Sequence, residues 1–159
     1  MEVRVGIADM NITHNPGKLV TIGLGSCIGI SLYDKRTGVA GLAHIMLPES
    51  DGFSNISNPL KFADLAIPLL IERMVTEGAS KNNLVAKIAG GASMFNFVDK
   101  SVNLDIGERN GKSVIKALER EGIPLASMDI GGNKGRTMIV DAFDGKVSVR
   151  IIGLGTKEI

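Results

Sequence analysis

The chain has 159 residues, 44% of them apolar, which is enough for one domain with a single core. Its 18 Lys and Arg nearly balance 17 Asp and Glu, and only 4% of residues are aromatic, so no nucleic-acid partner is expected. One cysteine excludes an intramolecular disulfide. No apolar segment has transmembrane length and the N-terminus lacks a signal-peptide pattern, so we expect a soluble, cytoplasmic protein without membrane insertion.

Turn residues and alternating polarity divide the first third of the chain into strands. Alternation predicts a strand over residues 2–7, and the sequence HNPG at 14–17 predicts a turn. Two further strands, KLVTIGL and CIGISLYD, are separated at Gly25 and Ser26. The loop KRTG then leads into the strand VAGLAHIMLP, which Pro48 ends.

The middle of the chain contains a polar loop and two predicted helices. The aperiodic stretch ESDGFSNISNP indicates a surface loop, and its final Asn-Pro begins a helix that runs to Gly78. Pro68 lies inside the apolar pattern, so this helix either kinks there or begins only about one turn earlier. The clearest helix covers residues 110–121, with Asn110 as its N-cap.

The remaining segments read as strands with Gly-rich turns: NLVAKIAGGA, SVNLDIG, PLASMDIGG, RTMIVDAF and KVSVRII. Asp144-Gly145 is a strong hairpin signal between the last two. GGNKGR lacks the spacing of a phosphate-binding loop, so we expect a Gly-rich hairpin turn there. Strands outnumber helices, which predicts an α+β fold for residues 1–159 as one domain, with mixed or antiparallel sheets layered with two or three helices.

Cys27 is the residue whose type leaves two roles open. A lone cysteine in an apolar strand is ordinarily a packing residue. Gly25 and Ser26 precede it, however, and small residues there let a substrate approach the backbone and leave amide N–H groups directed outward, as an oxyanion site requires. Cys27 is therefore either a core residue or a nucleophile at a strand end.

A count of residues across the predicted hairpin brings His44 to Cys27. If KRTG is a four-residue loop, Asp34 lies opposite Val39, and His44 then shares a face with Cys27 as a diagonal neighbour, with Cα atoms about 7–8 Å apart. The other histidine, His14, lies in a turn and is expected to be solvated. A core histidine is the alternative for His44, but the pair is more specific than either member.

Five segments, LGSCIGISLYD, GLAHIMLP, KIAGGASMF, IGERN and DIGGNKGR, occur in an order that resembles the chemoreceptor glutamine deamidases, the bacterial CheD family. The resemblance covers nearly the whole chain. It implies hydrolysis of the side-chain amides of particular glutamines in methyl-accepting chemotaxis receptors, with Cys27, His44 and Thr21 as the catalytic residues. It also implies a fold similar to bacterial toxin domains that deamidate a glutamine of small GTPases.

The chemistry of these residue types agrees with such an activity. A primary amide is a poor electrophile, so its hydrolysis needs a strong nucleophile, a proton for ammonia and an oxyanion site, here the N–H groups around Gly25, Ser26 and Cys27. Thr21 would orient the imidazole of His44 by accepting a hydrogen bond, although threonine is also a common strand residue. No cofactor is expected, and no further metal ligands accompany the pair at suitable spacing.

A different class of function is a regulatory binding module that acts by contact. The resemblance implies two partners, the receptors and the chemotaxis phosphatase CheC. The loops ESDGFSNISNP and GGASMFNFVD are the expected contact regions, with Met94, Phe95 and Phe97 as apolar contacts, unless these side chains are buried in a strand. A hydrolase of this type could also process glutamate methyl esters, because esters are easier acyl donors than amides.

Overall fold

The computed structural model describes residues 1–93 and 105–159. In this part of the chain ten strands form two five-stranded sheets. The first sheet has the order β1 (Glu2–Arg4), β3 (Lys18–Leu24), β8 (Arg136–Asp141), β9 (Val147–Ile151) and β10 (Gly155–Glu158). The second has the order β2 (Asp9–His14), β5 (Val39–Ile45), β4 (Ile28–Asp34), β6 (Leu84–Gly90) and β7 (Leu125–Ile130).

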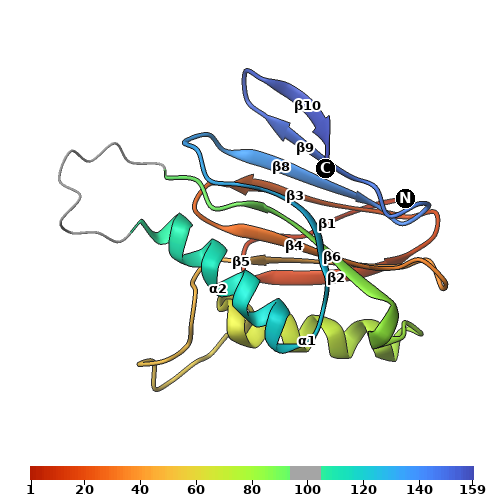
Figure 1. The fold of residues 1–159 in the computed structure, drawn as a ribbon, viewed down its shortest axis with the longest axis horizontal. Helices are drawn as coiled ribbons and strands as arrows, with labels where there is room; N and C mark the ends of the chain where they lie inside the picture. Colours follow the sequence, from red (N-terminus) through yellow and green to blue (C-terminus); the bar gives the residue numbers. More distant parts are fainter. Residues whose placement is uncertain (94–104) are drawn as a thin grey trace.

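Two α-helices cover one face of the second sheet, α1 (Ala63–Thr76) and α2 (Ile106–Arg120), and the first sheet covers its other face (Figure 1). Two short 3₁₀ turns, η1 (Pro59–Lys61) and η2 (Lys81–Asn83), flank α1. The pairs β1–β3 and β6–β7 are parallel and the other strand pairs are antiparallel, which confirms an α+β fold with mixed sheets. Neither described helix is long and apolar enough to cross a membrane.

Alternation along the central strand β4 separates two cores. Ile28, Ile30 and Leu32 pack against the helices, whereas Cys27 and Tyr33 pack against the first sheet. This is the period of two that a strand imposes on its side chains. Leu42 of β5 also belongs to the core between the sheets, and His44 shares its face. The candidate histidine therefore lies inside the sandwich.

The described chain crosses between the two sheets four times, and the last two of these crossings are turns that contain glycine. Residues 25–27 join β3 to β4, and residues 131–135 join β7 to β8. The prediction of a hairpin turn at GGNKGR was wrong, because β7 pairs with β6 and β8 pairs with β3 and β9. Local turn chemistry does not reveal whether the next strand joins the same sheet. The hairpin at Asp144-Gly145 is confirmed.

Other boundaries also differ from the predictions. The first strand ends at Arg4, and two strands were missed: β10, which is short and exposed throughout, and β2, in which Met10 and Thr13 are buried. The second helix begins at Ile106 with Asp105 as N-cap, so Asn110 is an interior residue, and the predicted strand SVNLDIG is helical from Ile106 onward. Residues 101–104, like Met94, Phe95 and Phe97, lie outside the described residues.

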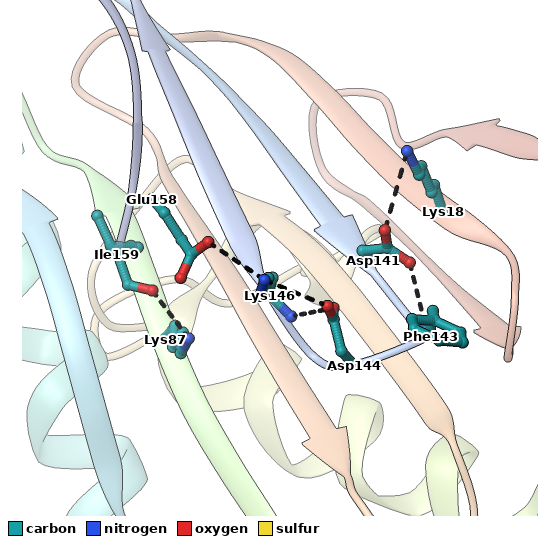
Figure 2. Close-up of polar contacts among 8 residues, drawn as sticks. All are labelled: Lys18, Lys87, Asp141, Phe143, Asp144, Lys146, Glu158 and Ile159. Carbon is teal, nitrogen blue, oxygen red and sulfur yellow. Dashed lines mark hydrogen bonds and ion pairs between the residues drawn. The ribbon is translucent and has the colours of Figure 1, made fainter.

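Away from Cys27, polar side chains form contacts within the first sheet and between the two sheets (Figure 2). Lys87 Nζ in β6 donates to the backbone oxygen of Ile159 at 2.8 Å, which ties the segment after β10 to the second sheet. Lys146 Nζ lies 3.7 Å from Asp144 and 3.9 Å from Glu158. These ion pairs are exposed and contribute little to stability, so the β8–β9 hairpin depends more on packing.

Asp34, the last residue of β4, is a buried acceptor for backbone N–H groups of two separate segments. Its fully buried carboxylate accepts hydrogen bonds from the N–H groups of Arg36, Thr37 and Ser80. Burial alone would raise the pKa of Asp34, but these bonds and one from Asn83 hold it below its ordinary value of 3.8. One carboxylate thus joins the β4–β5 turn to the segment before β6.

We expect Asp34→Asn to lower the free energy of unfolding by about 1–3 kcal/mol at pH 7, because the new amide nitrogen faces an N–H donor. Since the folded pKa is depressed, this stabilisation is present above the unfolded pKa and is lost as the pH falls through the folded one. Urea titrations at several pH values measure it. Asp51→Asn, in an exposed loop, is the control, and equal losses in both variants would contradict the assignment.

Candidate active site

A hydrogen bond between the two sheets joins Thr21 to His44. Thr21 lies in β3 and His44 in β5, and the Thr21 Oγ1 to His44 Nδ1 distance is 2.7 Å. Both residues are fully buried. The contact expected from the sequence is therefore present, and it exists because the β3–β4 crossing places these strands in facing sheets.

The surroundings of Thr21 determine the tautomer of the imidazole. Thr21 Oγ1 donates its proton to the carbonyl oxygen of Val5 at 2.7 Å, and a carbonyl can only accept. The hydroxyl must then accept from His44 Nδ1–H, so Nε2 carries the unprotonated lone pair. Within the described residues this buried Nε2 has no hydrogen-bond partner. His44 is oriented as a base whose acceptor nitrogen is available.

The segment after β1 holds the backbone on either side of this contact. Val5 supplies the acceptor for Thr21, and Ala8 N–H donates to His44 O at 2.8 Å. Ala8 has φ of 56°, a region that non-glycine residues seldom adopt, and its carbonyl accepts from Asn58 Nδ2 at 3.0 Å. This sparsely populated backbone geometry persists because hydrogen bonds on both sides over-determine it.

Cys27 lies one residue before β4 and is half-buried. The register pairs Ile28 with Ile45 and Gly29 with His44, and its extension places Cys27 opposite Met46, as the hairpin count predicted. Cys27 and His44 therefore face the same side, toward the first sheet.

Gly29 lies directly opposite His44 in the register, and its missing side chain leaves room for residues of the first sheet. A Cβ at Gly29 would lie 2.7 Å from the sulfur of Met138 and 3.2 Å from Leu24 Cδ1. Both distances are shorter than side chains tolerate without moving. The absence of a side chain thus leaves room beside the Thr21–His44 pair.

Burial sets the protonation states of the pair at neutral pH. It raises the pKa of the Cys27 thiol and lowers the pKa of His44 from 6.5 to about 4. In the resting protein Cys27 is therefore a thiol and His44 a neutral imidazole. For Cys27 to act as a nucleophile, its proton would have to be transferred first, and the free Nε2 of His44 could accept it.

The turn that carries Cys27 is held through its carbonyl groups. Gly25 O accepts from Ala92 N–H and Cys27 O from Gly91 N–H, both at 2.8 Å. The N–H of Gly25 donates to Gly23 O, whereas the N–H groups of Ser26 and Cys27 have no backbone acceptor in the described residues. The available donors are thus those of Ser26 and Cys27, and Gly25 contributes a turn.

No group of three or more His, Cys, Asp or Glu side chains that could hold a metal ion occurs in residues 1–93 and 105–159. His14, the histidine predicted to be solvated, is exposed, and its Nε2 lies 3.6 Å from Glu77 Oε2.

Comparison with known proteins places the chain in a family. Residues 46–151 match the family described as CheD chemotactic sensory transduction. A protein of Clostridium botulinum strain Alaska E43, named "Probable chemoreceptor glutamine deamidase CheD", is 62% identical over 158 residues, 99% of this chain and 98% of its own length. The chain belongs to the CheD family.

Of two further matches, one is similar in sequence and the other shows only a weak structural similarity. A CheD protein of the same name from Clostridium botulinum strain Eklund 17B is 61% identical over 158 residues, again 99% of this chain and 98% of its own length. The Bacillus licheniformis hypothetical protein YfiH matches 79% of this chain and 51% of its own at 16% identity, with a TM-score of 0.49, too distant for any functional conclusion. The CheD family match begins at Met46, so Thr21, Cys27 and His44 are covered by the full-length relatives only.

Two buried residues beside the candidate site were missed by the sequence analysis. Arg136 donates to Gly90 O and Gly131 O, and its Nε lies 3.3 Å from Asp129 Oδ2, which supports the turn behind Cys27. Asn110 donates to two backbone carbonyls of the site. Arg136 was predicted as the shared residue of the GGNKGR turn and the strand RTMIVDAF, and nothing in that pattern indicated that a charged residue there would be buried. Asn110 could have been found, because it continues the apolar stripe of Val114.

We expect the stability of the chain to fall with the protonation of His44. Because its folded pKa is depressed to about 4 from 6.5, stabilisation is complete above pH 6.5 and is lost as the pH falls from 6.5 to 4. Between pH 7.5 and pH 5 the unfolding free energy should drop by about 2 kcal/mol more in the wild type than in His44→Gln.

Urea unfolding at the two pH values measures this difference. His14→Gln, which removes the exposed histidine, is the matched control and should retain the wild-type pH dependence. The same pH dependence in wild type and His44→Gln would show that His44 is not held as a neutral base.

Proposed function

We propose that the chain hydrolyses the side-chain amides of specific glutamines in methyl-accepting chemotaxis receptors, giving glutamate and ammonia. Residues 1–159 would form a single deamidase domain, with Cys27 as nucleophile, His44 as acid and base, and Thr21 as the residue that orients His44. CheD relatives named as probable chemoreceptor glutamine deamidases, 62% identical over nearly the full length, support the substrate class.

One observation carries the chemical part of the proposal. The hydrogen bond from His44 Nδ1 to Thr21, whose own proton goes to Val5, leaves Nε2 as a free acceptor on the face that Cys27 shares. A core histidine held only for packing would not need its second nitrogen buried without a partner, since such a nitrogen destabilises the fold.

The reaction then proceeds by acyl transfer. His44 Nε2 takes the thiol proton while Cys27 Sγ bonds to the carboxamide carbon, and the π electrons of the C=O bond move to oxygen. The imidazolium gives its proton to the amide nitrogen, the C–N bond breaks, and ammonia leaves a thioester. Water attacks the thioester as His44 accepts its proton, and cleavage of the C–S bond releases glutamate and restores the thiol.

The oxyanion requires donors that no other group occupies. Ser26 and Cys27 N–H meet this condition among the described residues, whereas the N–H of Gly25 is bound to Gly23 O. We therefore propose Ser26 and Cys27 N–H as the oxyanion donors, with Gly25 permitting close approach of the substrate. The same site would process glutamate methyl esters, because their tetrahedral intermediate needs the same groups.

We expect Cys27→Ala to abolish deamidation, a fall of more than about 10³-fold, while the unfolding free energy changes by less than about 1 kcal/mol. The protein is incubated with a receptor cytoplasmic fragment, and each glutamine is read by mass spectrometry for a gain of about one dalton. Ser26→Ala keeps the backbone donors and is the matched control.

The same variant separates hydrolysis from a function by contact. A binding module, acting on receptors or on the phosphatase CheC, would keep its effect on receptor signalling in Cys27→Ala. Wild-type turnover in Cys27→Ala would remove Cys27 from the mechanism, and no mass change at any receptor glutamine with the wild type would remove the deamidase itself.

Thr21→Ala should lower kcat by about 10- to 100-fold with little change in receptor affinity, because it removes the acceptor that fixes the imidazole. Thr21→Ser retains the hydroxyl and should recover most of the rate. Turnover, receptor affinity and melting temperature are measured for both variants. If Ala and Ser behave alike and activity falls in step with stability, Thr21 fills a strand face and has no orienting role.

A further inference from the structure

Asn110 is a polar residue at a position where the helix pattern calls for an apolar one. It is fully buried in α2, one turn before the buried Val114 and two turns before Leu118 on the same stripe. Both of those residues belong to the core between the helices and the second sheet. An amide among them needs a reason other than packing.

Its hydrogen bonds lead directly to the candidate active site. Asn110 Nδ2 donates to Ser26 O at 2.9 Å and to Met46 O at 3.0 Å. Carbonyl oxygens only accept, so the amide orientation is fixed and both of its protons are used. Its Oδ1 is buried and has no partner among the described residues, an arrangement that destabilises the folded chain.

The bond to Ser26 O also sets the direction of a neighbouring N–H. The Ser26–Cys27 peptide is trans and planar, so the N–H of Cys27 points opposite to the C=O of Ser26. With that C=O held toward α2, the Cys27 N–H is directed away from the helix. It is one of the two free donors proposed for the oxyanion.

Three successive carbonyls of the turn accept hydrogen bonds, and only the middle one accepts from a side chain. Backbone N–H groups of Ala92 and Gly91 bind Gly25 O and Cys27 O, while Ser26 O receives the Asn110 side chain. The same side chain binds Met46 O, two residues after His44. One side-chain amide thus joins the turn that carries Cys27 to the segment that follows His44.

We infer that Asn110 is a positioning residue that aims the Cys27 N–H at the oxyanion and fixes the Cys27 turn against the His44 strand. The inference rests on the proposed acyl-transfer function. Because Asn110 acts through a peptide group, its loss should weaken the stabilisation of a tetrahedral oxyanion more than it changes the reactivity of the thiol.

Two substitutions test this role. Asn110→Leu has a similar volume and suits the apolar stripe, so it keeps packing and removes both donors. Asn110→Asp keeps the shape but places carboxylate oxygens against the carbonyls of Ser26 and Met46. Ser113→Ala is the matched control, because Ser113 is also buried in α2 and donates to a backbone carbonyl, Pro48 O at 2.9 Å, outside the Cys27 turn.

Two probes separate the oxyanion from the thiol. Iodoacetamide alkylates Cys27 by displacement of iodide and forms no oxyanion. A glutamine peptide whose carboxamide is replaced by an aldehyde reacts reversibly: Sγ bonds to the carbonyl carbon, the π electrons move to oxygen, and the thiol proton reaches that oxygen through His44. The dissociation constant of the aldehyde is read from its protection of Cys27 against iodoacetamide.

We expect both Asn110 variants to bind the aldehyde about 10- to 100-fold more weakly, and to lose kcat for receptor deamidation by a similar factor with KM unchanged. Their alkylation rates should stay within about threefold of the wild type, and Ser113→Ala should match the wild type in every assay. If circular dichroism shows that one of the two Asn110 variants does not fold, the inference is judged on the variant that does.

Unchanged aldehyde affinity in the folded variants, an equal loss in Ser113→Ala, or a wild type that forms no thiohemiacetal would overturn the inference. Failure of the proposed function gives a different result. In that case no receptor glutamine is modified by the wild type, yet the aldehyde affinity still depends on Asn110 and not on Ser113.

Discussion

The hydrogen bond between Thr21 and His44 is the contact on which the site depends, because it is made between two sheets rather than within one. It fixes the imidazole only while β3 and β5 face each other at the right distance. That distance is set by the core between the sheets and by the absence of a side chain at Gly29. The packing between the two sheets therefore determines the orientation of the proposed base, His44.

The turn that carries Cys27 is held in place by a different set of contacts. It lies where the chain leaves one sheet for the other, so no continuous strand ladder holds it. Its carbonyls are instead bound by the Gly91 and Ala92 N–H groups and by Asn110, while Arg136 holds the adjacent Gly90. A Cβ at Gly90 would meet Cys27 O at 2.2 Å, so this close approach of two backbones requires glycine. The turn is irregular, yet all three of its carbonyls are hydrogen-bonded.

Local pattern was sufficient to predict some parts of this arrangement and insufficient for others. The β4–β5 register followed from the length of one loop, and it placed His44 on the face of Cys27. The distribution of strands between two sheets did not follow, because a Gly-rich turn reads alike whether it folds a hairpin or crosses a sandwich. Asn110 was predicted to be a cap because capping residues are recognised by residue type. Its burial against Ser26 and Met46 depends on tertiary packing, which the local sequence does not reveal. The roles of Thr21, Cys27 and His44, and the likeness to toxin domains, stay predictions.

The neutral state of the resting pair has a consequence for the chemical durability of the protein. Oxidation by peroxide and capture by adventitious electrophiles both proceed through the thiolate, and burial keeps the Cys27 thiol protonated while His44 stays neutral. A catalytic cysteine maintained as a permanent ion pair with imidazolium would be exposed to such damage at all times. Here burial favours the thiol form of the only cysteine in the chain, which slows the formation of sulfenic acid at Cys27.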